Sequence, residues 1–193
     1  MKPQASTFKT PDYLLDLLHY PADGEDVVLI CHPDPRQQGT MMNKVVVSVA
    51  KAYQELGVNA VTFNFRAVKD AGHQNINDDI ADTQALLSWI MKSFKGAVDL
   101  VGFSFGSWVV NQCQNASIRR CLLIAPPIEK YAYQAPKVST YMIQGTLDDV
   151  VSPEATVQYA QSYHIPLTLL SGCGHFFHQR LLDVKKWVVA ING

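Results

Sequence analysis

Residues 98–110 read Val-Asp-Leu-Val-Gly-Phe-Ser-Phe-Gly-Ser-Trp-Val-Val, and their pattern is the strongest indication of the fold in the sequence. The mainly apolar residues 98–103 are typical of a short buried strand, and residues 105–112 are predicted to be helical. Between them, Gly102-Phe103-Ser104-Phe105-Gly106 matches the pattern G-x-S-x-G, in which a serine occupies a sharp strand-to-helix turn. Glycine suits positions 102 and 106 because a side chain at either would crowd the neighbouring backbone.

Short apolar runs alternate with longer amphipathic runs on both sides of this stretch. The alternation predicts an α/β fold, with a doubly wound, mostly parallel sheet flanked by helices. Residues 13–19 fit either an antiparallel edge strand or a helical turn. Strands are predicted at 27–31, 58–65, 98–103, 120–125, 138–144 and 166–170, and helices at 43–56, 77–94, 105–112, 153–163 and 176–191.

The composition indicates a folded chain with one domain spanning residues 1–193. The sequence is 48% hydrophobic and 17% charged, and no linker or change in composition divides it. Its 16 basic and 17 acidic residues give a net charge of −1, which argues against a nucleic-acid partner.

The cellular location is predicted from three further features. No apolar run approaches the roughly 18 residues of a membrane-spanning helix, so no membrane partner is expected. Residues 1–11 contain no apolar core of a signal peptide. The four cysteines are widely spaced, which is typical of free thiols in a reducing cytoplasm.

A serine in such a turn acts as a nucleophile when a base and an acid assist it. With G-x-S-x-G the chain order is serine, acid, histidine. Asp148 follows the predicted strand at 138–144, and His175 follows the predicted strand at 166–170. Because ligands bind at the carboxyl ends of parallel strands, these loops are expected to meet at one edge of the sheet. We therefore predict Ser104 as nucleophile, Asp148 as acid and His175 as base. Asp149 is predicted to be a solvated neighbour of Asp148 without a catalytic role.

The tetrahedral intermediate of such a reaction needs two backbone N–H donors, which form an oxyanion hole. Phe105, the residue after the nucleophile, is expected to supply one of them. The loop at 32–36 is expected to supply the second, and its two prolines have no N–H. Asp34 and Arg36 remain, and Asp34 is favoured by position, provided that its carboxylate points away. His32 is predicted to bind the backbone at the end of its strand.

With these residues, the chain resembles the α/β-hydrolase superfamily. It is similar in particular to a small capless group of bacterial hydrolases, which are dienelactone-hydrolase-like and short-chain esterase-like. The resemblance implies a minimal α/β-hydrolase fold without a cap domain and the same triad of Ser104, Asp148 and His175. The stretches that carry it are residues 31–35 (Cys-His-Pro-Asp-Pro), 39–41 (Gly-Thr-Met), 43–46 (Asn-Lys-Val-Val), 64–66 (Asn-Phe-Arg), 102–106, 125–127 (Ala-Pro-Pro), Gly145 with Asp148 and Val151, and 174–178 (Gly-His-Phe-Phe-His).

The chain departs from the family pattern in places that bear on substrate preference. Residues 67–73 have lost most of the glycines usual after Arg66, Gln38 replaces the first glycine of a pair, and Gln144 stands where histidine is usual. Arg66 is expected either to bind a substrate carboxylate or to pair with an aspartate. The aspartates available for that ion pair are Asp78, Asp79 and Asp82.

These features predict a serine hydrolase that cleaves a small carboxylic ester or thioester through an acyl-enzyme. Its only expected partner is a small-molecule acyl substrate. No nucleotide-binding glycine motif is present, and no nearby set of Cys, His and Glu residues completes a metal site with His175 and His178, so neither cofactor nor metal is expected. Two alternatives stay open: an acyl-peptide or C–C bond hydrolase with the same triad, and a non-catalytic binding protein of this fold.

Overall fold

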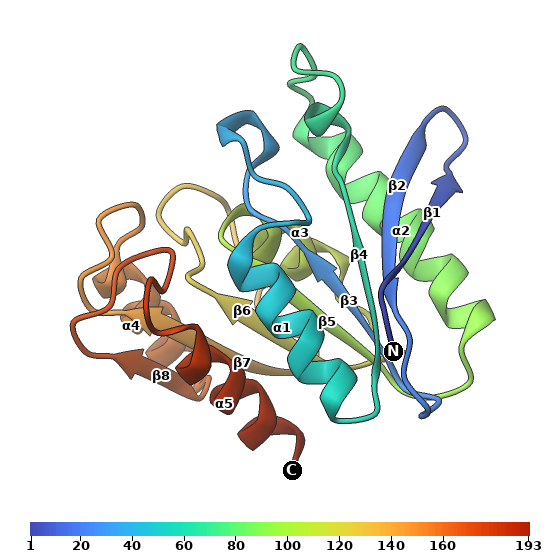
Figure 1. Cartoon of the computed structure of the whole chain (residues 1–193). Helices are drawn as coiled ribbons and strands as arrows, with labels where there is room; N and C mark the ends of the chain where they lie inside the picture. Colours follow the sequence, from blue (N-terminus) through green and yellow to red (C-terminus); the bar gives the residue numbers. More distant parts are fainter.

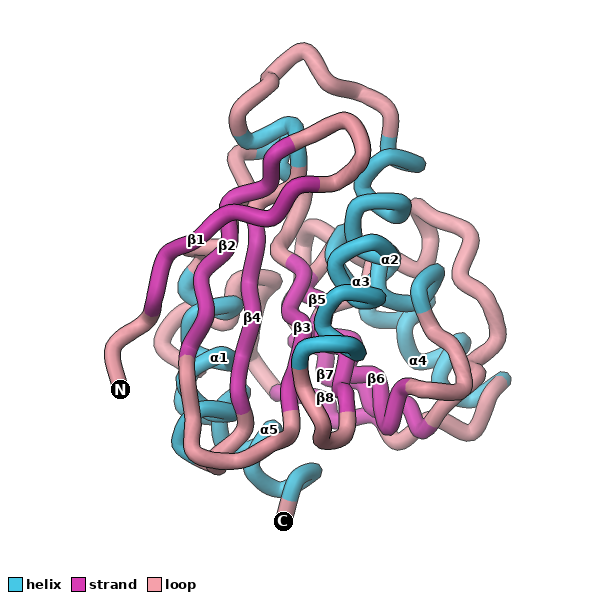
Figure 2. The backbone as a smooth tube through the Cα atoms, turned by 90° about the vertical axis from the view of Figure 1, so that its right-hand side faces the viewer, coloured by secondary structure: helices cyan, strands magenta, loops and turns pink.

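Eight strands form one sheet in the computed structural model, which describes residues 1–193 (Figure 1). The strands are β1 (Gln4–Lys9), β2 (Leu14–Tyr20), β3 (Val27–Cys31), β4 (Asn59–Phe63), β5 (Val98–Phe103), β6 (Ile118–Ile124), β7 (Ser139–Gly145) and β8 (Leu167–Leu170). They lie in the order β1-β2-β4-β3-β5-β6-β7-β8. All neighbours from β4 to β8 are parallel, whereas β1 and β2 are antiparallel additions at one edge (Figure 2). The predicted mostly parallel sheet is confirmed.

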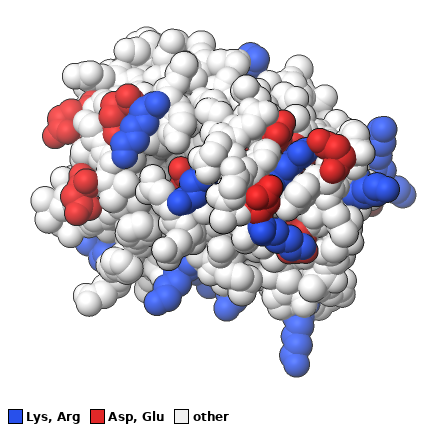
Figure 3. Space-filling view, turned by 90° about the horizontal axis from the view of Figure 1, so that it is seen from above, with Lys and Arg blue, Asp and Glu red and all other residues white.

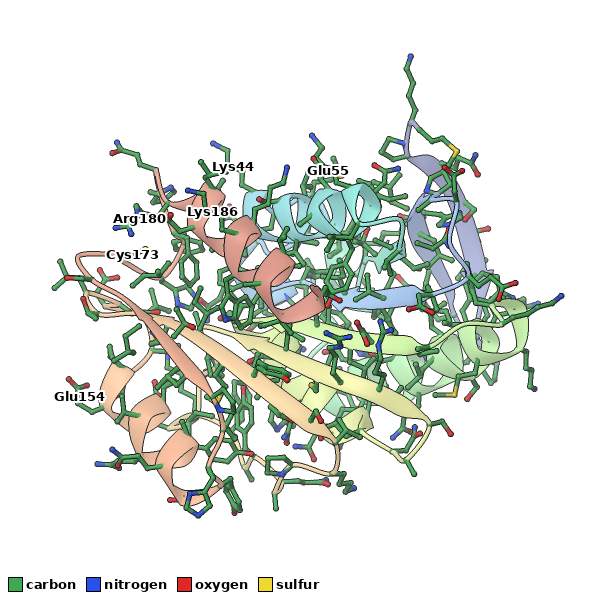
Figure 4. The ribbon with its side chains drawn as sticks, turned by 90° about the horizontal axis from the view of Figure 1, so that it is seen from below. Lys44, Glu55, Glu154, Cys173, Arg180 and Lys186 are labelled. Atoms are coloured by element: carbon green, nitrogen blue, oxygen red, sulfur yellow. The ribbon has the colours of Figure 1, made fainter.

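Helices cover both faces of this sheet. They are α1 (Lys44–Glu55), α2 (Ile76–Ser93), α3 (Phe105–Cys113), α4 (Pro153–Ser162) and α5 (Leu181–Asn192). Helices α1 and α5 lie on one face and α2, α3 and α4 on the other; Figure 4 shows Lys44 and Lys186 on the first side and Glu154 on the second. Buried clusters of 25 and 22 residues fill the two interfaces, so neither face of the sheet is open. None of the helices combines the length and apolarity that a membrane crossing requires.

Two elements at the chain's ends differ from the sequence prediction. The polar strand β1 was not predicted, because it is an exposed edge strand held by pairing with β2 and has no apolar alternation. Residues 13–19 form most of β2, whose Leu15 and Leu17 are buried. The last helix begins at Leu181 rather than at 176, since Phe177 and Gln179 have φ angles of 50° and 61°, which a right-handed helix excludes.

The chain between β6 and β7 contains no helix and builds no lid. It packs instead against α3: Tyr131 stacks on Trp108 with ring centres 4.9 Å apart, and the Tyr133 hydroxyl lies 2.7 Å from the Ser107 hydroxyl. No helical lid therefore covers the carboxyl ends of β5, β7 and β8, and only loops, including those after β3 and β6, surround them.

Candidate active site

The turn between β5 and α3 holds Ser104 in an unusual backbone conformation. Its φ and ψ angles are 52° and −124°, a region that side-chain-bearing residues rarely adopt. A Cβ atom at position 102 would lie 2.2 Å from the Gly106 oxygen, and one at position 106 would lie 2.3 Å from the Cys31 oxygen. Both positions are therefore limited to glycine by close backbone approach, and the strand and helix present the serine hydroxyl between them.

Three loops bring Ser104, His175 and Asp148 together. The Ser104 Oγ lies 3.0 Å from His175 Nε2, and His175 Nδ1 lies 2.8 Å from an Asp148 carboxylate oxygen. A carboxylate only accepts hydrogen bonds, so Nδ1 carries the imidazole proton and Nε2 is free to accept the serine proton. His175 is 3% exposed and Asp148 is 8% exposed, so water competes little for the bond between them.

The Asp148 carboxylate is fixed by four donors. One oxygen accepts from His175 and from the Gln144 side-chain amide at 2.8 Å, and the other accepts from the N–H groups of Val150 and Val151 at 2.9 Å each. Burial raises the pKa of Asp148, but these hydrogen bonds outweigh it and hold the pKa below its usual value. Asp149 is exposed and makes no hydrogen bond.

Gln144 was noted in the sequence only as a departure from the family pattern. It is fully buried at the end of β7, and its amide oxygen lies 3.4 Å from the Thr156 hydroxyl, which is nearer to the Ser152 oxygen at 3.2 Å. Its amide nitrogen faces Asp148, whose carboxylate only accepts hydrogen bonds. A polar residue at the end of a predicted buried strand was the available signal, but its partner could not be known before the fold.

Two backbone N–H groups near Ser104 have no acceptor. They belong to Phe105 and Asp34, whereas the Arg36 N–H donates to the Asp34 carboxylate at 3.0 Å. Because the Arg36 N–H is engaged in that bond, Asp34 is the better candidate of the two residues considered as second N–H donor. The Asp34 carboxylate also accepts from Arg36 Nε at 2.7 Å, so it is held by its own loop.

A cleft of about 120 Å³ joins these groups. Ser104, His175, Phe105 and Asp34 all line it. The remaining lining residues are Pro33, Gln37, Gln38, Gly39, Asn43, Pro127, Lys130, Tyr131, Val150, Val151 and Phe176. The upper side in Figure 1 carries the loops after β3 and β4, and Figure 3 shows acidic and basic side chains close to one another on that side.

Arg66 lies outside this cleft and pairs with aspartates. Its guanidinium donates to Asp82 at 2.6 Å and to Asp12 at 2.8 Å, with Asp78 at 3.9 Å. The ion-pair alternative is thus observed, although Asp12 was not foreseen and Asp79 pairs elsewhere.

His32 is completely buried and binds backbone at both ring nitrogens. Its Nε2 accepts from the Phe65 N–H at 3.0 Å, and its Nδ1 lies 2.6 Å from the Pro33 oxygen. Burial, together with the nearby charge of Arg36, lowers its pKa from 6.5 to about 3. The contacts agree with the structural role predicted for this residue.

The depressed pKa of His32 makes the protein less stable in acid. Below pH 6.5 the unfolded imidazole takes up a proton that the folded one refuses, so stability falls with pH by up to about 1.4 kcal/mol per unit. Urea unfolding of wild type and His32→Gln between about pH 6.5 and 5 measures this. As the pH falls, we expect the variant to lose less free energy of unfolding than the wild type, by up to about 1.4 kcal/mol per pH unit. Burial also raises the pKa of Asp79 to about 6, so this carboxyl adds stability as the pH falls. Both proteins contain Asp79, so its effect is common to the two. Equal pH slopes would contradict the assignment.

Comparisons with known proteins place this geometry in a family. The chain matches no family model. It is 30% identical over 187 residues to an uncharacterized protein of Rickettsia prowazekii, covering 86% of this chain and 76% of that protein. An α/β serine hydrolase homologue from Coxiella burnetii superimposes with a TM-score of 0.90 at 28% identity, covering 100% of this chain and 99% of that one. An α/β serine hydrolase without a lid from Xanthomonas campestris gives 0.89 at 29% identity, covering 98% and 93%.

The fold and these relatives define the class: the chain belongs to the α/β-hydrolase superfamily. Within that superfamily it belongs to the small capless group, in agreement with the absence of a lid between β6 and β7.

Proposed function

We propose that the protein is a serine hydrolase that cleaves small carboxylic esters or thioesters. One observation carries the proposal: the continuous chain of hydrogen bonds from Ser104 through His175 to Asp148 at the edge of a lined cleft. This order of nucleophile, base and orienting acid is what acyl transfer by a serine requires.

In the proposed reaction, Ser104 Oγ attacks the acyl carbonyl while His175 Nε2 takes its proton. The Asp148 carboxylate stabilises the imidazolium that forms and keeps its ring in place. The N–H groups of Asp34 and Phe105 bind the oxyanion of the tetrahedral intermediate. His175 then gives the proton to the leaving group, and water attacks the acyl-enzyme by the same route in reverse.

A panel of activated esters and thioesters with short acyl groups tests this proposal. Turnover that saturates with substrate and is lost on phosphonylation of the protein is the expected result. No turnover of any member would contradict the proposal.

All four cysteines are free thiols in the structure. The cytoplasmic location predicted from their spacing in the sequence stays a prediction.

Acyl chain length is expected to limit the reaction. The cleft has a volume of only about 120 Å³, and no lid encloses a longer chain. Each CH₂ left in water forgoes about 0.8 kcal/mol of transfer free energy, so extra carbons add little binding. We expect kcat/KM to peak at about two to four acyl carbons. A p-nitrophenyl ester series from acetate to palmitate measures this; a steady rise beyond about eight carbons would require a long apolar channel.

A further inference from the structure

The Arg36 side chain connects the two segments that carry the free N–H groups. Its Nε donates to the Asp34 carboxylate at 2.7 Å, and its guanidinium carbon lies 4.6 Å from the centre of the Phe105 ring. Asp34 belongs to the loop after β3, and Phe105 is the first residue of α3. One side chain therefore contacts both residues of the proposed oxyanion hole.

Asp79 anchors this guanidinium from a third element. Its carboxylate, in the first turn of α2, is fully buried and accepts from Arg36 Nη1 at 3.1 Å. The Arg36 side chain is only 14% exposed and does not line the cleft. With two carboxylates already bound, it is not placed to bind an anionic substrate.

No backbone hydrogen bond joins residues 33–39 of the Asp34 loop to α3. The N–H groups of Gln37 and Gly39 both donate to the Asp34 oxygen, and that of Gln38 donates to the Pro35 oxygen. These bonds shape the loop internally. Its start is packed on α3, because a Cβ at Gly106 would lie 2.6 Å from the His32 oxygen. Beyond that start, side-chain contacts such as those of Arg36 join the loop to α3. An oxyanion hole needs both donors within about 2.7–3.1 Å of one oxygen, so the distance of the loop from α3 matters for the reaction.

We infer that Arg36 is a positioning residue that holds the N–H groups of Asp34 and Phe105 at the separation an oxyanion requires. The inference rests on the proposed serine hydrolase function. It assigns Arg36 no contact with substrate: the residue acts through the Asp34 carboxylate, the Phe105 ring and the Asp79 anchor.

The test compares Arg36→Gln with Arg66→Gln. Both arginines are largely buried and pair with an aspartate of α2, but Arg66 contacts neither Asp34 nor Phe105. For Arg36→Gln we expect kcat for p-nitrophenyl acetate to fall about 10- to 100-fold with KM nearly unchanged, since misplaced donors cost less than a deleted one. The inhibition constant of trifluoroacetone, which forms a tetrahedral oxyanion on the serine, should rise by the factor that kcat/KM falls.

Arg66→Gln should leave kcat and the inhibition constant within about threefold of wild type, even if it lowers the melting temperature. If Arg36→Gln does not fold, Asp79→Asn replaces it, with Asp82→Asn as its control. A folded Arg36→Gln with wild-type kcat, or equal losses in the Arg36 and Arg66 variants, would overturn the inference alone. A wild type that neither hydrolyses the ester nor binds trifluoroacetone would instead contradict the proposed function on which it rests.

Discussion

Ser104→Ala is expected to remove nearly all ester turnover while the protein stays folded. The serine oxygen lies 3.0 Å from the only nitrogen placed to take its proton, and alanine offers no nucleophile there. Losses of triad residues in other serine hydrolases reach about 10⁴- to 10⁶-fold in kcat. The fold should persist because alanine fits the space of serine and both flanking glycines remain.

Steady-state kinetics on the best short-chain ester, with a thermal melt of each protein, measures this effect. Ser48→Ala is the control, because that half-buried serine on α1 lies outside the cleft. The assignment of Ser104 is wrong if its alanine variant keeps more than about a tenth of wild-type kcat.

Asp148→Asn is expected to lower kcat about 10³- to 10⁴-fold, and Asp149→Asn less than tenfold. An amide nitrogen facing His175 Nδ1 donates instead of accepting, so the imidazole keeps its proton on Nε2 and cannot accept the serine proton. Asp149 is exposed and makes no hydrogen bond, so its charge reaches the site only through water.

Asp149→Asn is a matched control for Asp148→Asn, because the two residues are adjacent. Both variants remove one negative charge from the same loop, and only one of them changes the partner of His175. The two variants are compared in the same ester assay at the same pH, with folding checked by circular dichroism. A larger loss in Asp149→Asn than in Asp148→Asn would reverse the assignment.

Much of the fold was predictable because buried parallel strands leave a strong pattern. Strands β3 and β5 are buried at every position; β3 is a continuous apolar run, and in β5 only Asp99 and Gly102 interrupt the large apolar residues. The candidate triad was predictable for a related reason: each member lies in the connection that follows a strand of the parallel sheet, and parallel strands bring their carboxyl ends to one edge. The exposed edge strand β1 has no comparable pattern, because pairing of its backbone and not burial holds it in place.

The supporting contacts of the site could not be predicted from local sequence. Gln144 donates to Asp148 only four residues away, but that contact depends on the turn after β7, which brings the two side chains together. Arg36 meets Asp79 across 43 positions, so neither propensity nor spacing identifies the pair. The choice between Asp34 and Arg36 likewise depended on a side-chain hydrogen bond, which appears only once the loop has folded.

Reaction with a fluorophosphonate tests whether Ser104 is an activated nucleophile, because the probe reacts with an activated serine whatever the natural substrate is. The intact mass should rise by one phosphonyl group per chain, and peptide mapping should place the group on Ser104. Ser104→Ala should remain unlabelled under the same conditions. A protein that stays unlabelled, or that carries the group on another residue while hydrolysing esters, would show that Ser104 is not the nucleophile.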